Sequence, residues 1–261
     1  MNILGRKLGR MNGSVAIQSR PGNHLMTRRH TNRLLESLSP ENRELLLARC
    51  TAVSVPAETV FYEPDRIPHH GWFLTSGLAS TVAFTTEGAV VGVGRIGNEA
   101  VVGGLHLLGP ACIPSRCFMQ LAGTALRIAF SDLQQFFWSS IEIRARLLEL
   151  IQEQVALFHQ CAACHLQHQA KERLASLLLV LQDRTQLDVL DVTQELLATM
   201  LGTRRSTVSV LAADLQSRSV IAYSRGQVRI LNRTKLERAA CGCYPINQRL
   251  HRRLYRYGVP A

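Results

Sequence analysis

The segment 192–216, VTQELLATMLGTRRSTVSVLAADLQ, has the residue spacing of a helix-turn-helix. Counted from Gln194, the small residue Ala198 comes four places later, where two crossing helices meet. Gly202 comes eight places later, where the chain must turn sharply and where a positive φ favours glycine. Val208 follows at a spacing that anchors a second helix on the first. Because the size, turn and spacing requirements are met together, a helix-turn-helix is favoured over an ordinary helical hairpin.

The second helix of this segment presents a basic and hydroxylated outer face. Thr193 and Thr203 stand where the N-caps of the two helices are expected, since a Thr hydroxyl accepts a hydrogen bond from a free backbone N–H there. A helix with arginines on its outer face fits the major groove of DNA, where arginine pairs with guanine edges. The residues of this segment that are predicted to contact DNA are Thr193, Arg204, Arg205, Ser206, Thr207 and Ser209.

The net charge of +11 is unevenly distributed along the chain. Residues 1–33 hold seven Lys or Arg and no acid, residues 192–235 hold seven against two acids, and residues 236–261 hold five against one. The intervening 34–191 is acidic on balance. Positive charge concentrated on the helix-turn-helix and on both ends is typical of a polyanion-binding protein, and it predicts double-stranded DNA as the partner.

Composition and motifs exclude several other classes. At 261 residues, with 46% hydrophobic and 19% charged residues, the chain suits about two globular domains. No apolar run approaches the roughly 20 residues that span a bilayer, so no membrane partner is expected. The N-terminus lacks the pattern of a secretory signal, which predicts a cytoplasmic protein. Seven cysteines, an odd number, argue against a disulfide framework. No nucleophile elbow, phosphate loop or carboxylate pair stands out, so the chain is not expected to be an enzyme.

The N-terminal half alternates short β-rich runs with turn residues. Residues 1–33 are interpreted either as a flexible basic arm or as an extension upstream of a start at Met11 or Met26. From 34 to 138, after a helical opening, β-branched and aromatic runs alternate with Gly, Pro, Asn and Asp. Strands at this spacing predict an antiparallel sandwich or barrel, which we interpret as a sensor domain. The runs lie at 59–62, 72–74, 80–84, 90–93 and 125–130.

A helical period replaces the strand pattern from about residue 131 and continues to 168. Apolar residues recur there at alternating steps of three and four, which is the narrow seam that pairs two helices in a coiled coil. The alternative is that this face packs on the helix's own domain. The length of the helix without breakers favours a dimerisation helix over 139–168. The residues of the predicted seam are Leu148, Ile151, Val155, Phe158 and Ala162.

The residues after the helix-turn-helix predict a small hairpin. Two β-rich runs, 219–223 and 228–231, flank a turn with Arg225 at its tip. Beside a helix-turn-helix, such a hairpin is the wing of a winged helix, and Arg225 is placed to contact a phosphate. A plain hairpin with a solvated arginine is the alternative. The winged helix-turn-helix is assigned to 169–238, and 239–261 is interpreted as a basic tail.

With a β-rich barrel, a long paired helix and a winged helix-turn-helix in this order, the chain resembles the Crp/Fnr family of bacterial transcription regulators over roughly 34–236. The resemblance implies an α+β fold with an N-terminal antiparallel β jelly roll of the cyclic-nucleotide-binding type. It also implies a homodimer on a near-palindromic operator, with RNA polymerase as a further partner. The N-terminal stretches that match are Val60-Phe-Tyr-Glu-Pro64, Trp72-Phe-Leu74 with Gly77, Gly97-Asn-Glu-Ala-Val-Val-Gly103 and Gln120-Leu-Ala-Gly-Thr-Ala-Leu-Arg127.

The resemblance assigns a role to Arg205 in particular. This residue stands where the family often has a base-reading arginine, which implies a bidentate guanine contact worth about 1–3 kcal/mol of discrimination. Ser206 and Val210 depart from the Glu and Arg that the family often has at those places. The resemblance therefore does not assign an operator sequence to this chain.

The resemblance also bears on the ligand of the barrel. A cyclic-nucleotide pocket needs a carboxylate for the ribose hydroxyl and an arginine for the phosphate. Glu99 fits the first requirement, but position 109, near where the arginine is expected, is Gly, and Arg116 comes only later. We therefore assign Glu99 and Arg116 to an effector pocket with an incomplete motif, with a turn-stabilising Glu99 as the alternative. No cofactor is expected.

A cysteine and histidine pattern leaves one alternative function open. Cys161-Ala-Ala-Cys164-His165 matches the attachment motif of c-type haem, and His159 and His168 lie nearby. The alternative is a haem- or metal-binding redox sensor that uses Cys161, Cys164 and His165. Spacing on one helix does not favour it over chance, and no metal site is assigned.

Cys241 and Cys243 are interpreted as incidental, and an N-terminal iron–sulfur cluster is not expected. Cys241 and Cys243 are too close together to chelate one metal comfortably without other ligands. The first cysteine is Cys50, whereas the iron–sulfur cluster of some family members is held mainly by cysteines near the N-terminus.

Overall fold

The computed structural model describes residues 31–109 and 113–256. The predicted arm at 1–33 lies outside the described residues except for its last three. The described chain opens with two short helices, α1 (Arg33–Glu36) and α2 (Pro40–Leu47).

The buried side chain of Asn32 attaches this opening to the rest of the domain. Its carboxamide oxygen accepts from the backbone N–H of Leu34 and so caps α1. Its amide nitrogen donates to the carbonyl of Leu74 at 2.9 Å and to that of Ala100 at 2.8 Å. Because these two carbonyls belong to the strand-rich region, one buried side chain fixes the position of the first helix against it.

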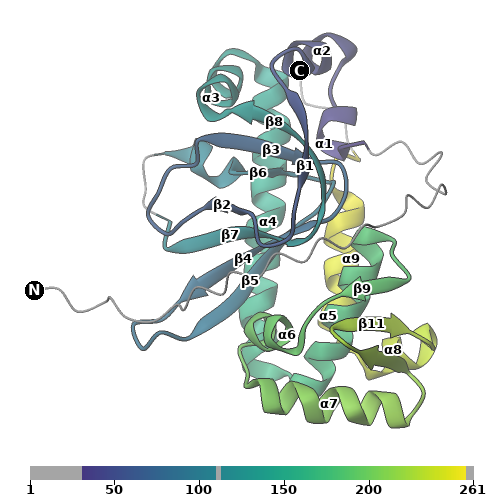
Figure 1. Cartoon of the computed structure of the whole chain (residues 1–261). Helices are drawn as coiled ribbons and strands as arrows, with labels where there is room; N and C mark the ends of the chain where they lie inside the picture. Colours follow the sequence, from purple (N-terminus) through teal and green to yellow (C-terminus); the bar gives the residue numbers. More distant parts are fainter. Residues whose placement is uncertain (1–30, 110–112, 257–261) are drawn as a thin grey trace, which may run out of the picture.

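The described residues between 51 and 129 form a barrel of two antiparallel sheets (Figure 1). The first sheet has the order β1-β8-β3-β6 and the second the order β2-β7-β4-β5. All paired strands run antiparallel, so the predicted antiparallel architecture is confirmed. The elements are β1 (Thr51–Val55), β2 (Val60–Tyr62), β3 (His70–Leu74), β4 (Leu78–Phe84), β5 (Val90–Ile96), β6 (Val101–Val102), the short helix η1 (Gly104–Leu108), β7 (Ser115–Leu121) and β8 (Gly123–Ala129).

The core of this domain lies between the two sheets and the helices that cover them. Phe73 of the first sheet and Met119 of the second are almost fully buried in it. Leu133 and Leu147, from the two helices that follow the barrel, belong to the same core. The helices are therefore part of the barrel's folding unit and not a separate attachment.

Those two helices are α3 (Phe130–Ser139) and α4 (Ile141–Gln167). The sequence predicts one uninterrupted helical stretch, but Ser140 interrupts it with an extended backbone and caps α4 by accepting from the N–H of Ile143. In Figure 1, α4 runs along the barrel and beyond it toward the C-terminal elements. No helix among the described residues is long and apolar enough to cross a membrane.

A second domain, residues 170–239, follows the end of α4. Most residues of its hydrophobic core come from this domain and not from the barrel. They include Leu178, Leu197 and Val208. The predicted winged helix-turn-helix fold is confirmed, with a third strand, β9, that the sequence did not indicate. The elements are α5 (Ala170–Thr185), β9 (Val189–Asp191), α6 (Gln194–Leu201), α7 (Arg205–Ser217), β10 (Ile221–Ser224), β11 (Gln227–Ile230) and α8 (Arg233–Ala239).

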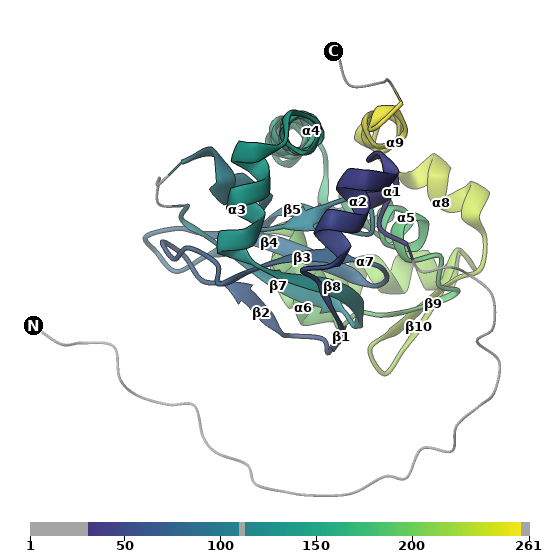
Figure 2. The same cartoon turned by 90° about the horizontal axis from the view of Figure 1, so that it is seen from above.

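The segment interpreted as a basic tail contains a helix, α9 (Cys243–Arg253). It lies beside α4, as the view from above shows (Figure 2). The first turn of α9 buries Tyr244 in the core of the second domain, and Leu254 after its end is buried in the core of the barrel. The tail therefore connects the two domains, while Arg249 and Arg252 on its outer face stay in solvent.

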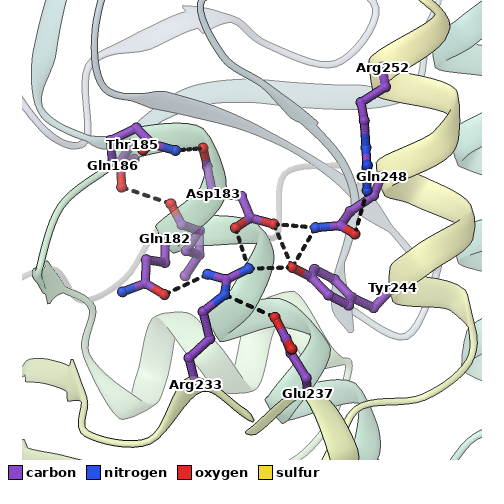
Figure 3. Close-up of polar contacts among 10 residues, drawn as sticks. Gln182, Asp183, Thr185, Gln186, Arg233, Glu237, Tyr244, Gln248 and Arg252 are labelled. Carbon is purple, nitrogen blue, oxygen red and sulfur yellow. Dashed lines mark hydrogen bonds and ion pairs between the residues drawn. The ribbon is translucent and has the colours of Figure 1, made fainter.

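A polar network around Asp183 attaches α9 to α5 and α8 (Figure 3). The carboxylate of Asp183 accepts from Arg233 at 2.7 Å, from the hydroxyl of Tyr244 at 2.7 Å and from the amide of Gln248 at 3.0 Å. Arg233 also donates to Glu237 at 2.9 Å within α8. Three helices thus meet at one carboxylate.

We expect Asp183→Ala to lower the free energy of unfolding by about 1–3 kcal/mol, because it leaves the polar groups of Arg233 and Tyr244 without their shared acceptor. Urea denaturation followed by circular dichroism measures the change. The control is Glu237→Ala, which removes an exposed ion pair within one helix and is expected to cost only about 0.3–0.5 kcal/mol. Equal losses for both variants would contradict a central role for Asp183.

Candidate nucleic-acid interface

The first helix of the helix-turn-helix is defined by a cap at each end. The hydroxyl of Thr193 accepts from the N–H of Leu196 at 3.1 Å, as predicted for an N-cap. Gly202 ends the helix in the left-handed region with φ 57°, and the next N–H, of Thr203, donates back to the carbonyl of Ala198 at 3.0 Å. This arrangement closes a helix C-terminus and favours glycine, because a side chain there would strain the backbone.

The second helix, α7, starts one residue later than predicted. Arg204, and not Thr203, is its N-cap, and its side chain makes no capping hydrogen bond. The first turn of α7 therefore has free backbone N–H groups next to two arginine side chains. Exposed backbone donors and positive charge at a helix N-terminus are what an anion such as a phosphate binds.

The outward face of α7 carries the residues that the sequence predicted. Val208 and Leu215 are buried in the core that contains α5 and α6, and Ala212 is buried as well, which fixes the rotation of the helix about its axis. Arg204, Arg205 and Ser206 are exposed at the start of α7 and Ser209 along it, Thr207 is partly exposed, and Val210 is 69% exposed.

The wing places its arginine beside this face. Arg225 and Gly226 form the two-residue turn between β10 and β11, with φ of 49° and 79°. Positive φ at both positions is the geometry of a type I′ hairpin turn, which glycine favours at the second position. Arg225 is exposed at its tip. An open groove of about 580 Å³ lies between the wing and the two helices, and Thr193, Arg205 and Arg225 all line it.

The barrel contacts the helix-turn-helix directly, which the sequence did not indicate. The β4–β5 hairpin packs on the end of α6, where Gly92 lies against Met200. A Cβ atom on Gly92 would lie 2.9 Å from the Cα atom of Met200, so only glycine fits. Val91 packs on Gly202 at the turn. The signal in the sequence was the run Val90-Val-Gly-Val93, whose glycine weakens a strand interior and marks a close backbone approach.

The residues of the predicted dimer seam lie on two different faces of α4. Ile151 is buried in its own chain, and Phe158 packs against Gly94 of the barrel. Leu148, 45% exposed, and Val155, 38% exposed, point away from the barrel, as does the exposed Ala162. The spacing of apolar residues at steps of three and four predicted one seam. It did not distinguish the face of α4 that packs on the barrel from the face that does not.

Glu99 and Arg116, the two residues assigned to an effector pocket, each form an ion pair with another residue of the protein. Glu99 is buried, accepts from the N–H of Gly97 at 3.0 Å and forms an ion pair with Arg184 of α5. Arg116 forms an ion pair of 2.7 Å with Glu63 and lies over the ring of Phe84. The structure thus supports the turn-stabilising alternative for Glu99.

The cavity inside the barrel contains neither of these residues. It has a volume of about 80 Å³ and is lined mainly by apolar side chains and backbone, with Tyr62, Thr81, Ser115 and Gln154 as its members with polar side-chain groups. No arginine, lysine or acidic side chain lines it. The cavity therefore lacks the charged pair that a cyclic nucleotide would require.

Glu99 belongs to a buried charge cluster where α4 and α9 meet the barrel. Burial raises the pKa of Glu99, but the charge of Arg184 outweighs this and holds its pKa below the ordinary value. Burial raises the pKa of Glu153 on α4 to about 7. Burial lowers the pKa of His251 on α9 to about 4, although its ring lies 3.9 Å from the carboxylate of Glu153.

Cys161, Cys164 and His165, the residues of the haem- or metal-binding alternative, line one cavity but do not form one set of ligands. The thiol of Cys161 points to the carbonyl of Gly92 at 3.7 Å. The thiol of Cys164 lies 3.6 Å from that of Cys241 instead. Among the described residues, the side chains close enough to share a metal include Cys164 but neither Cys161 nor His165.

Comparisons with known proteins agree with this geometry. Residues 172–239 match the family of Crp-like helix-turn-helix domains, a range that runs from α5 through both helices and the wing. A search of curated protein sequences finds no match.

Several solved structures share the fold of most of this chain. A regulator of the Crp/Fnr family from Eubacterium rectale has a TM-score of 0.64 at 17% identity, over 79% of this chain and 96% of its own. The c-di-GMP responsive regulator CLP from Xanthomonas campestris has a TM-score of 0.60 at 18% identity, over 74% and 99%. A CRP-family regulator from Thermus thermophilus has a TM-score of 0.61 at 20% identity, over 73% and 96%. At these identities, the likeness shows a common fold.

The charge cluster generates a pH prediction. Because the folded pKa of Glu153 is about 7 and the ordinary value is 4.5, the folded chain holds this proton more tightly than the unfolded chain. Its contribution is therefore most favourable at low pH and is lost as the pH rises through 7. We expect Glu153→Gln, which stays neutral, to stabilise the chain by on the order of 2–3 kcal/mol at pH 8 and by much less at pH 5.

Urea denaturation at the two pH values measures this difference. Glu44→Gln, which removes an exposed carboxylate on α2, is the control and is expected to change the free energy of unfolding by less than about 0.5 kcal/mol at either pH. The same gain for Glu153→Gln at pH 5 and at pH 8 would contradict the raised pKa.

Proposed function

We propose that this chain, a Crp/Fnr-type regulator in fold with a Crp-like helix-turn-helix domain, controls transcription as a homodimer bound to a near-palindromic operator. The observation that carries the proposal is the groove that brings Thr193, Arg205 and Arg225 onto one exposed basic surface. Thr193 is the N-cap of α6, Arg205 is in the first turn of α7 and Arg225 is at the tip of the wing, so three separate elements contribute to this surface, which also includes Glu195. Such a regulator acts in the cytoplasm and contacts RNA polymerase as well as DNA.

The proposed readout divides the residues by what they can reach. Arg205, in the first turn of α7, reads a guanine edge in the major groove, and Arg204 lies beside it. The exposed side chain of Val210, five residues further along α7, suits the methyl group of a thymine. Thr193 and Arg225 lie at the two sides of the groove and contact phosphates, which set the register without reading sequence.

The dimer interface of this proposal is the outer face of α4. Ile141, Leu148, Val155 and Ala162 recur there every seven residues and are exposed in the single chain. Ala145 and the exposed Leu166 extend the same face at the intermediate step of four. A second copy would bury this apolar line by coiled-coil packing, in which each side chain inserts between those of the partner helix. The twofold axis then places two copies of α7 in successive major grooves.

The signal that controls this regulator reaches the second domain through the β4–β5 hairpin. Gly92 and Val91 touch the end of α6 and the turn that leads into α7, so a displacement of the hairpin moves the DNA-contacting helix. Glu99 and Arg116 have protein partners, and for this reason the proposal involves no cyclic nucleotide bound between them.

Arg205→Ala tests the base reader. On an operator selected from random DNA by the unaltered protein, the variant is expected to lose about 1–3 kcal/mol of specific binding, while its salt-sensitive binding to bulk DNA largely persists. Fluorescence anisotropy with the operator and with a scrambled duplex measures both. Arg249→Ala, which removes the same charge from the outer face of α9, is the matched control and should leave the ratio unchanged. If specific and bulk binding fall equally in Arg205→Ala, the assignment of this residue to base reading is wrong.

Val155→Lys tests the dimer interface. A lysine at the centre of the proposed seam places two like charges opposite each other, so we expect the dimer to dissociate at concentrations where the unaltered chain stays paired. Sedimentation equilibrium gives the mass. Ile67→Lys makes the same change at an apolar residue that is 62% exposed on the barrel and should leave the mass unchanged. A dimer that is unaffected by Val155→Lys would contradict this interface.

A further inference from the structure

Four sulfur and nitrogen ligands converge where α4 ends. Cys164 lies in the last turn of α4, and His168 follows as the residue that ends this helix. Cys241 and Cys243 lie in the connection from α8 into α9, more than 70 residues further along the chain. The three thiol sulfurs and the nearest imidazole nitrogen all lie within 4.8 Å of one another.

The distances within the cluster are those of a tetrahedral metal site. With a zinc–sulfur bond of about 2.3 Å, the sulfur atoms at two corners of a tetrahedron lie about 3.8 Å apart. The sulfurs of Cys164 and Cys241 are separated by 3.6 Å. The sulfur of Cys243 and Nδ1 of His168 are separated by 3.5 Å. Both separations are close to the edge of such a tetrahedron.

The backbone holds the two halves of the cluster together before any ion binds. Cys164 and His168 are four residues apart, so both side chains leave the end of α4 on the same side. The N–H of Cys241 donates to the carbonyl of Glu172 at 3.4 Å, which ties the other half to α5. Cys241 and Cys243 are buried, whereas Cys164 and His168 are partly exposed, which leaves a path for an ion from solvent.

One neighbouring side chain orients a ligand of the cluster. The amide nitrogen of Gln160, one turn before Cys164 on α4, donates to the sulfur of Cys243 at 3.0 Å. Hydrogen bonds of this kind to ligating sulfurs are common around metal centres, where they fix the ligand and adjust its basicity.

We propose that Cys164, His168, Cys241 and Cys243 bind one zinc ion in a tetrahedral site with three thiolates and one imidazole. On binding, each cysteine that is protonated releases its proton to solvent, the histidine binds through its neutral ring, and no electrons are transferred. Zinc fits this donor set better than magnesium or calcium, which prefer oxygen ligands. The four protein ligands fill the coordination sphere, so the site is structural and leaves no open position for catalysis.

The proposed zinc site lies at the junction between the two domains, which connects it to the proposed function. His168 stands at the junction between α4 and α5, which is where the second domain is attached to the long helix. The zinc ion would link this junction to the start of α9, whose far end lies against the barrel. Zinc therefore fixes the angle between the two domains. This consequence rests on the proposed function, but the binding of zinc does not.

The test begins with the metal content of the full chain, purified without chelators. We expect one zinc per chain by elemental analysis, and a lower Tm after the zinc is removed with a strong chelator. Cys243→Ser should abolish stoichiometric zinc, while Cys161→Ser, a neighbouring thiol outside the cluster, should retain it. Operator binding is measured separately, so that a failure of the zinc site and a failure of the DNA-binding proposal are distinguishable.

Two further measurements keep the proposal testable if Cys243→Ser fails to fold. His168→Cys supplies a fourth thiolate and should retain zinc. Cobalt added to the metal-free unaltered chain should give the strong visible bands of a tetrahedral thiolate complex, and zinc should displace it.

Several results would overturn the proposal. One is a metal-free chain that takes up neither zinc nor cobalt, and another is loss of zinc in Cys161→Ser. The presence of iron with labile sulfide would assign the four residues to an iron–sulfur cluster instead. A further contradicting result is a disulfide between Cys164 and Cys241, found by peptide mass analysis in protein freshly purified from a reducing cytoplasm. It would show that the two sulfurs bond to each other and not to zinc.

Discussion

The ion pair between Arg184 and Glu99 constrains the whole arrangement of the molecule. Arg184 stands near the end of α5 in the second domain, and Glu99 lies between β5 and β6 of the barrel. Both side chains are less than 10% exposed, and Arg184 donates in addition to the carbonyl of Arg95 at 3.1 Å. Removing either partner would leave a buried charge without compensation, which is strongly unfavourable. The two domains consequently meet in an orientation that satisfies this pair.

Two further contacts between the domains stabilise the same relative orientation. The β4–β5 hairpin supports the end of α6, while α9 returns from the second domain to the barrel and contributes Leu254 to its core. The hydroxyl of Tyr255, next to Leu254, donates to the backbone carbonyl of Glu99 at 2.9 Å, so the returning segment contacts the residue that holds Arg184. The barrel, α4 and the helix-turn-helix are thus connected at both ends of the second domain.

The parts of this fold that the sequence predicted correctly depend on residues close together in the chain. Ala198, Gly202 and Val208 lie within eleven positions, and each meets a local steric requirement of the helix-turn-helix. The strands of the barrel are likewise marked by short β-rich runs between turn residues. The cap of α7 was misassigned by one residue, since Thr203 and Arg204 both stand at the boundary and only the backbone conformation distinguishes them.

The parts that were missed depend on residues far apart. Glu99 fits the start of an effector motif, and nothing near it in the sequence reveals Arg184, which lies 85 residues away. The seam on α4 was divided between two faces because apolar residues occupy both, and only packing against Gly94 and the barrel core decides which face is inward. Cys241 and Cys243 could not chelate one ion alone. The fold supplies Cys164 and His168, which a linear pattern cannot show.

The contact of Gly92 with Met200 limits how the two domains can move relative to each other. A gap too small for a methyl group leaves no room for the strand and the helix to slide past one another by small amounts. Closely packed surfaces of this kind either stay engaged or separate, because intermediate positions lose contacts without gaining others. On the proposed function, the two domains would switch between discrete states, and a graded stimulus would change the proportion of molecules in each state and not the shape of any one of them.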